Sequence, residues 1–200
     1  MIDSRDTSER IGQSIICGLD EVGRGALAGP LVAVGVILPR SFTHPLLRDS
    51  KLLSSSQREK AFAAIQKAAS FREVWIGVRT IDTLGIQRAN QLAFETLVET
   101  IPADTYLVDG NLTLRTQRRY TSIPHGDRLH PEIAAASILA KVIRDHHMTS
   151  LATLHPQYGW ERNRGYGTAS HVDAIGQFGI TTEHRMTFKL NYALDKQNAR

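Results

Sequence analysis

A ten-residue segment in the second half of the chain, Ile133 to Val142 (IAAASILAKV), is apolar on nearly every side when it is drawn as a helix. It belongs to a longer helical pattern that we expect to run from Pro131 to His147. A helix that is apolar almost all round is stable in water only when other elements cover it. The chain therefore has to fold into a layered domain around this helix, and its 200 residues are enough for a substantial core.

Apolar periodicity elsewhere in the chain predicts the sheet on which the buried helix packs. Three early strands favour an antiparallel meander, and later strands alternate with helices. A capping box at Ser56–Glu59 (SQRE) opens the first predicted helix. The predicted strands are residues 14–19, 31–38, 71–79, 105–108 and 118–123, and the predicted helices are 56–69, 86–101, 131–147 and 168–176. This order predicts an α/β fold in which a mixed sheet is flanked by helices.

The charge balance and the single cysteine narrow the functional classes only slightly. Lys and Arg outnumber Asp and Glu by 24 to 20, which permits a polyanionic partner without requiring one. Cys17 is the only cysteine, so an internal disulfide and a thiolate zinc cluster are excluded, and its apolar neighbours favour a buried thiol.

Targeting signals are missing from the sequence. The polar N-terminus lacks the apolar core of a signal peptide, and no run reaches the ~20 apolar residues of a membrane span. We therefore expect a cytoplasmic protein without membrane contact. We expect a flexible lead at residues 1–13, followed by a single domain at 14–200 that includes a helical segment from about residue 155.

Four acidic residues fall near the edge of the predicted sheet. Asp20 and Glu21 are adjacent and follow the first strand, Asp109 follows a later strand, and Asp127 lies a few residues before the buried helix. Parallel neighbouring strands would bring the first three carboxylates together, since ligands of open α/β sheets collect at the carboxyl ends of strands. Clustered carboxylates repel one another unless cations lie among them, and oxygen ligands suit Mg²⁺ or Mn²⁺. Two such ions ~4 Å apart can clamp the attacking and leaving oxygens of a phosphoryl displacement.

Simpler interpretations of the same acids stay open at this point. Asp109 with Gly110 fits a turn, and Asp127 fits a cap of the following helix; for either residue alone these are the commoner roles. Only the adjacent pair Asp20 and Glu21, beside glycines, favours a functional site unaided.

The glycines that follow the acidic pair also have two interpretations. Gly23, Gly25 and Gly29 loosely match a dinucleotide-binding loop, but that loop opens a helix, whereas a strand pattern follows here. We interpret them as positions at which the backbone approaches a ligand closely. Arg24, between two of these glycines, can supply positive charge to a phosphate.

A second candidate site is a glycine-rich segment in which aromatic and basic side chains alternate. The residues are Tyr158, Trp160, Arg162, Arg164 and Tyr166. Such a mixture suits nucleic acid, because rings pack on sugars or bases and guanidinium groups bind phosphates. The alternative is a loop whose aromatic side chains close the edge of the core. Most of the eight histidines fit surface or core-edge positions, and His171 and His184 are the two that merit inspection.

Several sequence blocks, in order along the chain, resemble ribonuclease HII, the type 2 ribonuclease H. The blocks are LDEVGRGALAGP (19–30), DSK (49–51), DGN (109–111), Gly126–Asp127, IAAASILAKVIRD (133–145), Tyr158–Gly159, GYGT (165–168) with His171, and His184–Arg185 with Phe188. The resemblance covers roughly residues 14–190, which is nearly the whole chain.

The resemblance implies a ribonuclease H-like fold with a small C-terminal helical region. It implies endonucleolytic cleavage of RNA in RNA–DNA hybrids, and of single ribonucleotides embedded in duplex DNA, with two Mn²⁺ or Mg²⁺ ions. It further implies a 5′ nick that leaves 5′-phosphate and 3′-hydroxyl ends. We expect a monomer, and the tail (NYALDKQNAR) shows no obvious sliding-clamp motif.

The resemblance also assigns roles to individual residues. The metal-binding catalytic acids correspond to Asp20, Glu21, Asp109 and Asp127. The motif that senses the ribose 2′-hydroxyl corresponds to Gly23, Arg24 and Gly25, and the tyrosine that packs on the following deoxyribose corresponds to Tyr166. Further substrate contacts correspond to Ser50, Lys51, Ser137, Lys141 and Arg144. Asp145 lies 18 positions after Asp127, well down the helix, and we interpret it as a supporting residue rather than a ligand.

Two other functional classes remain as alternatives. A non-catalytic hybrid-binding module would bind without divalent cations, but four acids at the contact face argue against it. A metal-dependent phosphohydrolase of small substrates would share the acids, but it would not need the aromatic and basic segment.

Overall fold

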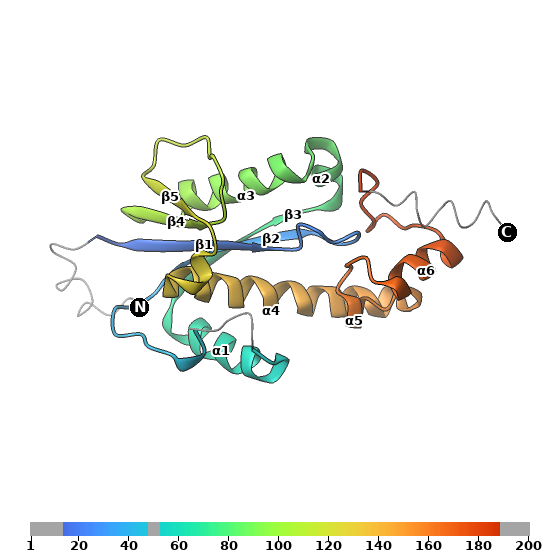
Figure 1. The fold of residues 1–200 in the computed structure, drawn as a ribbon, viewed down its shortest axis with the longest axis horizontal. Coiled ribbons are helices and arrows are strands. Elements are labelled where there is room, and N and C mark those ends of the chain that lie inside the picture. Colours follow the sequence, from blue (N-terminus) through green and yellow to red (C-terminus); the bar gives the residue numbers. More distant parts are fainter. Residues whose placement is uncertain (1–13, 48–52, 189–200) are drawn as a thin grey trace.

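Residues on both faces of the central strands are buried, which requires helices on each side of the sheet. In the computed structural model, which describes residues 14–47 and 53–188, five strands pair in the order β3-β2-β1-β4-β5 (Figure 1). The strands are β1 (Ile16–Val22), β2 (Leu31–Ile37), β3 (Ser70–Ile76), β4 (Thr105–Asp109) and β5 (Tyr120–Ile123). β1 pairs antiparallel with β2, as does β2 with β3, whereas the pairs β1–β4 and β4–β5 are parallel. The predicted mixed sheet and its antiparallel meander are confirmed.

The helices form one layer on each face and a small group at one end (Figure 1). α2 and α3 cover one face, α4 and α1 lie on the other, and α5 and α6 lie at the far end of α4. The helices are α1 (Ser55–Ala68), α2 (Val78–Leu84), α3 (Ile86–Thr100), α4 (Pro131–Leu154), α5 (Trp160–Asn163) and α6 (Ala169–Phe178), with short 3₁₀ turns η1 (Pro45–Leu47), η3 (Gly126–Arg128) and η4 (Pro156–Tyr158). Within the described ranges no helix is long and apolar enough to cross a membrane.

The sheet separates two apolar clusters. On β2, Leu31 and Ala33 pack with Phe94 of α3, whereas Val32 and Val34 pack on the side of α4. The segment that is apolar all round is buried as predicted, because β1 and β2 cover one side of α4 and α1 covers another.

The start of α4 lies against β1, and a glycine permits the contact. A Cβ atom at Gly18 would lie 2.2 Å from the backbone carbonyl carbon of Glu132, so any larger residue would push the helix away. Gly18 is two residues before Asp20 on the same strand. This close packing brings the first turns of α4 to the part of β1 that carries the acids.

Several details of the predicted secondary structure are wrong. β1 continues to Val22 because it pairs with β2 along its whole length, so Asp20 and Glu21 lie within the strand and not after it. The capping box is formed by Ser54 and Gln57, two residues earlier than predicted. The third strand ends at Ile76, and the short helix α2 follows at once. α4 extends to Leu154, and the one-turn helix α5 was not predicted. The predicted flexible lead at residues 1–13 lies outside the described residues.

Candidate active site

Two parallel strands bring the predicted acids to one edge of the sheet. In the β1–β4 pair, Leu19 lies opposite Val108, so Asp20 and Asp109 follow at the same end of neighbouring strands. Successive side chains of a strand point to opposite faces. Asp20 therefore points toward α4, as Gly18 does, and Glu21 points toward α3, as the buried Leu19 does. The two adjacent acids reach the same edge from the two faces of the sheet.

Asp20 is the more deeply buried of the adjacent pair, at 7% exposure. Burial raises the pKa of Asp20 well above its usual range, and the charges of Glu21 and Asp109 raise it further. Hydrogen bonds from the Ser137 hydroxyl and from the backbone N–H of Glu21, the latter at 2.7 Å, oppose this rise. The carboxyl group is therefore held in place by neutral donors that do not cancel its charge.

Glu21 lies in a similar electrostatic environment, with one cation nearby. Burial raises its pKa to about 7, and the charge of Asp109 contributes to the rise. Arg24, whose Nη1 lies 3.4 Å from Oε1 of Glu21, and the amide of Asn90 lower it. Arg24 is half exposed, so its charge is partly screened by water. The edge therefore carries more negative charge than its own neighbours neutralise.

Asp109 connects the end of β4 with the η3 turn that precedes α4. Its Oδ1 accepts a hydrogen bond of 2.7 Å from the backbone N–H of Gly126. This bond brings the turn, with the buried Asp127, to the same edge of the sheet. Asp109 is the last residue of β4 and presents a carboxylate beside Asp20.

The acids line an open edge and do not form a closed cage. Within the described ranges, no three His, Cys, Asp or Glu side chains are close enough together to enclose a metal ion. Mg²⁺ in proteins is commonly held by one or two carboxylates, with water and substrate phosphates completing its shell. Buried carboxyl groups with raised pKa values are suitable ligands for such cations, because a bound cation removes the repulsion between them.

Two buried arginines anchor the loop between β1 and β2, which follows the acids, by hydrogen bonds to its carbonyl oxygens. Arg144 of α4 donates to the carbonyl oxygens of Pro30, Ala28 and Arg164 at 2.8–3.0 Å. Arg185 donates to the carbonyl oxygens of Gly29 and Arg24 at 2.8–3.0 Å. Burial lowers the pKa of Arg185 to about 10, and the positive charge of Arg144 contributes. Two cations therefore lie directly beneath the loop.

The predicted substrate contact of Arg144 does not fit this structure. Its side chain is fully buried and its N–H groups are bonded to carbonyl oxygens of the chain itself, so no surface remains for a phosphate. Ser137 lies beside Asp20, where its hydroxyl lowers the pKa of the carboxyl group, and its predicted substrate contact stays a prediction. Ser50 and Lys51 lie outside the described residues.

The glycine-rich segment after α5 pairs with the same loop. Tyr166 forms a β-bridge with Ala26, and the carbonyl oxygen of Gly165 accepts from the N–H groups of Leu27 and Ala28. The Tyr166 ring is half-buried, with the Arg144 guanidinium 5.5 Å and the Lys141 ammonium 6.0 Å from its centroid. The loop that carries Gly23, Arg24 and Gly25 and the loop that carries Tyr166 therefore form one surface.

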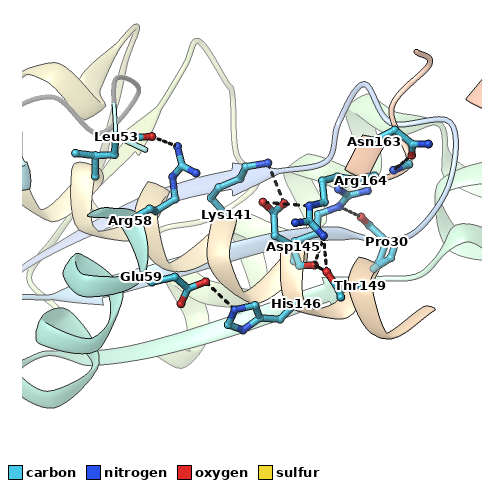
Figure 2. Close-up of polar contacts among 12 residues, drawn as sticks. Pro30, Leu53, Arg58, Glu59, Lys141, Asp145, His146, Thr149, Asn163 and Arg164 are labelled. Carbon is cyan, nitrogen blue, oxygen red and sulfur yellow. Dashed lines mark hydrogen bonds and ion pairs between the residues drawn. The ribbon is translucent and has the colours of Figure 1, made fainter. Parts of the chain in front are cut away.

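Asp145 holds two cations at the border of this surface (Figure 2). Its Oδ1 lies 2.9 Å from Lys141 Nζ and its Oδ2 lies 3.6 Å from Arg164 Nε. Arg164 also donates to the backbone carbonyl oxygen of Asp145 and to the hydroxyl of Thr149. Asp145 lies more than two helical turns beyond Ser137, and its contacts are with cations, not with the acids.

The other aromatic residues of the segment close the core instead of facing solvent. Trp160 is fully buried, and its Nε1 donates to His171 at 2.9 Å. His171 Nε2 lies 3.3 Å from Nε2 of the buried His184. Tyr158 packs on Trp160 with a centroid distance of 5.1 Å. For Trp160 and Tyr158 the core-edge alternative is therefore correct.

Two residues near the site were missed from the sequence. Asn90 interrupts the apolar face that Ile86, Ala93 and Leu97 form on α3, and a polar residue in such a stripe is a detectable signal. Arg185, which anchors the loop, belonged to a matched block but had no assigned role, because only the tertiary structure shows its carbonyl partners.

Comparisons with known proteins agree with the resemblance. A family model described as ribonuclease HII matches residues 17–194. The ribonuclease HII of Geobacillus sp. (strain WCH70) is 46% identical over 181 residues, which cover 88% of this chain and 65% of that protein. The ribonuclease HII of Porphyromonas gingivalis (strain ATCC BAA-308 / W83) is 44% identical over 181 residues, which cover 86% of this chain and 88% of that protein. The structure of the PCNA:RNase HII complex from Archaeoglobus fulgidus matches with a TM-score of 0.75 and 25% identity, and covers 88% of this chain and 96% of that chain.

Proposed function

This chain belongs to the ribonuclease HII family of metal-dependent endoribonucleases, and on that premise we propose that it hydrolyses the RNA strand of RNA–DNA hybrids and nicks duplex DNA on the 5′ side of single embedded ribonucleotides. One observation carries the proposal: buried acids converge at the edge of the sheet directly beside an exposed loop that can face a nucleic acid. Carboxylates on such a surface repel phosphates unless cations lie between them. The arrangement therefore favours metal-dependent cleavage over passive binding.

The donor set fits hard divalent cations. We propose that Asp20, Glu21, Asp109 and Asp127 hold two Mg²⁺ or Mn²⁺ ions, because all four side chains are oxygen donors and the mutual repulsion of Asp20, Glu21 and Asp109 is relieved by positive charge. When bound, the ions supply charge that activates a water for in-line attack and stabilises the leaving 3′-oxygen. Cleavage of this kind leaves 5′-phosphate and 3′-hydroxyl ends.

The exposed loop after β1 is suited to contact a ribose. Arg24 and Gly25 are exposed, and no atom lies within 4 Å of a Cβ built on Gly25. The glycine is therefore not required by the packing of the protein, which leaves close approach of the substrate as its reason. The 2′-hydroxyl distinguishes RNA from DNA, and backbone groups of this loop are in a position to bind it.

The surface beside this loop supplies contacts to the flanking strand. We propose that the Tyr166 ring packs on the deoxyribose after the ribonucleotide, and that Lys141 and Arg164 bind phosphates. Asp145 keeps the two cations in place, and the buried Arg144 and Arg185 add positive potential beneath the surface. The chain is proposed to act as a monomer. The predicted absence of a sliding-clamp motif concerns the tail at residues 191–200, which lies outside the described residues, and stays a prediction.

A labelled DNA duplex with one ribonucleotide tests the proposed function directly. We expect a nick 5′ of the ribonucleotide in Mg²⁺ or Mn²⁺, no nick in EDTA, and an intact all-DNA control. Tyr166→Ala should reduce cleavage of this substrate more than cleavage of a long hybrid, because its proposed contact is with the deoxyribose at the junction.

Other results would contradict parts of the proposal. If the protein cleaves the long hybrid but not the duplex with one ribonucleotide, the proposed cleavage at embedded ribonucleotides is wrong. Binding of the duplex without cleavage in either metal would favour a hybrid-binding module. If the protein hydrolyses a small phosphodiester and added duplex does not inhibit this reaction, a phosphohydrolase of small substrates would be favoured.

A further inference from the structure

Asn90 is a buried polar residue with no hydrogen-bond partner in the part of the chain that the structure describes. Its side chain is fully buried on α3, and neither amide atom has a hydrogen-bond partner within the described ranges. Buried amides of this kind destabilise a folded protein, and most are bonded in native structures. The surrounding face of α3 is apolar, with Ala93 and Phe94 in the core. Packing alone gives no reason for an asparagine at this position.

The side chain of Asn90 faces the carboxylate that points to the α3 side of the sheet. β1 sends Asp20 toward α4 and Glu21 toward α3. On the α4 side, Ser137 supplies a neutral hydrogen bond to Asp20. On the α3 side, Asn90 is near enough to Glu21 to interact with its carboxyl group, although the two groups do not reach hydrogen-bonding distance. The two adjacent acids thus each have one neutral polar neighbour from the helix on their own face.

We propose that Asn90 is a positioning residue for metal binding, whose amide N–H donates to the Glu21 carboxylate and holds it toward the bound ions. This inference rests on the metal site of the proposed function. The amide is suited to the task because it is neutral, whereas Arg24, which forms an ion pair with Glu21, competes with a cation for the carboxylate charge. Removing a group that hydrogen-bonds a metal ligand and orients it commonly weakens metal binding about 10- to 100-fold.

Direct Mn²⁺ titration of the substrate-free protein tests the inference. Asn90→Leu has a similar size but cannot donate a hydrogen bond. We expect it to bind Mn²⁺ about 10- to 100-fold more weakly than the wild type by calorimetry, while its melting temperature without metal is equal or higher because two unsatisfied groups are removed. Cleavage by Asn90→Leu should recover at high Mn²⁺ with KM for the duplex unchanged, which a general packing defect would not produce.

A control on the same helix and a second variant complete the experiment. Thr96→Val removes a hydroxyl that bonds the Leu92 carbonyl oxygen, outside the site, and should leave Mn²⁺ affinity unchanged. Asn90→Ala removes the amide without added bulk and carries the same expectation if the leucine variant fails to fold. Mn²⁺ affinity within twofold of the wild type in a folded Asn90 variant overturns the inference.

The same titration separates failure of this inference from failure of the proposed metal site. If Asp109→Asn abolishes Mn²⁺ binding and Asn90→Leu binds Mn²⁺ like the wild type, only the role of Asn90 is rejected. Wild-type Mn²⁺ binding that is unaffected by Asp109→Asn rejects the proposed metal site, and the role of Asn90 with it.

Discussion

At the scale of single residues, the site depends on how two adjacent carboxylates are oriented. Side chains that follow one another on a strand point to opposite faces, so Asp20 and Glu21 are each contacted by a different helix. The strand also keeps their backbone rigid, which side chains on a flexible loop would lack. The repulsion between the two carboxylates lowers the stability of the metal-free protein, and a bound cation relieves it.

Gly25→Ala separates substrate contact from folding. Because a Cβ at Gly25 meets no atom within 4 Å, the free energy of unfolding should change by less than about 0.5 kcal/mol. Cleavage at an embedded ribonucleotide should fall by about tenfold or more, because a methyl group displaces the ribose from the backbone. Urea unfolding and single-turnover cleavage measure the two effects. An alanine variant with wild-type cleavage would show that the substrate does not approach this position.

Gly23→Ala is the matched control on the other side of Arg24. Gly23 has φ = +92°, and a Cβ there would lie 2.3 Å from Nε of the buried Arg144. We expect this variant to lose about 1–3 kcal/mol of stability. A stable Gly23→Ala protein would mean that the loop can move away from Arg144, contrary to the anchoring described above.

At the scale of elements, α4 connects the acids with the surface around Tyr166. Ser137, Lys141 and Asp145 recur every four residues and Arg144 lies seven residues after Ser137, so all four lie on one side of the helix. The first turns of α4 contact the acidic edge, and later turns bind the loop carbonyl oxygens and the two partly exposed cations, Lys141 and Arg164. One rigid helix thereby sets the distance between the acids and the surface on which the flanking strand is proposed to bind.

Asp145→Asn tests whether this residue acts on substrate binding or on metal. Without the carboxylate, Lys141 and Arg164 lose their shared partner, and we expect KM for the duplex to rise about two- to fivefold, since ion pairs near the surface are worth up to about 1 kcal/mol. The kcat and the Mn²⁺ affinity should stay near wild type. Asp127→Asn should show the opposite pattern, with Mn²⁺ binding weakened. Loss of Mn²⁺ binding in Asp145→Asn would instead assign it to the metal site.

We expect His184, which follows the C-terminal helix α6, to make the free energy of unfolding depend on pH. Burial lowers the pKa of His184 to about 4, and the neighbouring His171 and His155 contribute. In the unfolded chain a histidine has a pKa of about 6.5. Between these values the unfolded state binds the proton and the folded state does not, so stability falls as the pH is lowered from about 6.5 to about 4 and is fully present above 6.5.

Urea unfolding at several pH values, with wild type and His184→Gln, measures this contribution. The variant should be less stable at pH 7, since its bonds to Thr181 and His171 are altered, but its stability should depend less on pH below 6.5. Equal slopes in the two proteins would assign the acid sensitivity to other groups.

At the scale of the whole molecule, the charges are distributed unevenly. Negative charge is concentrated at the edge formed by β1 and β4, and two buried arginines lie beneath the neighbouring loops. A divalent cation at the acidic edge should therefore stabilise the entire fold, because it relieves repulsion that only the folded state contains.

Thermal unfolding with and without Mn²⁺ measures this coupling. At free Mn²⁺ about 100-fold above Kd, one site should add about 2.7 kcal/mol of stability. Asp109→Asn should abolish both cleavage and the Mn²⁺-dependent rise in melting temperature, while its melting temperature without metal stays equal or increases. A similar rise in this variant would place the Mn²⁺ elsewhere.

The sequence by itself determined the elements and the composition of the site. A segment apolar on all sides required burial, and apolar runs together with one alternating segment predicted the strands, since these patterns follow from local geometry and burial alone. Adjacent acids before glycines indicated a cation site through charge repulsion. Cys17 was correctly predicted to be buried, and burial raises its pKa to about 12.

Only the tertiary structure decided which partners these residues have. The strand pairing extended β1 through both acids, and the packing of α4 on Gly18 brought Ser137 to Asp20. Arg144 is an internal anchor of the loop, and two of its three carbonyl partners come from residues more than 100 positions earlier in the chain. Asn90 faces Glu21 for the same reason: spatial neighbours distant in sequence are set by packing, which local patterns do not encode.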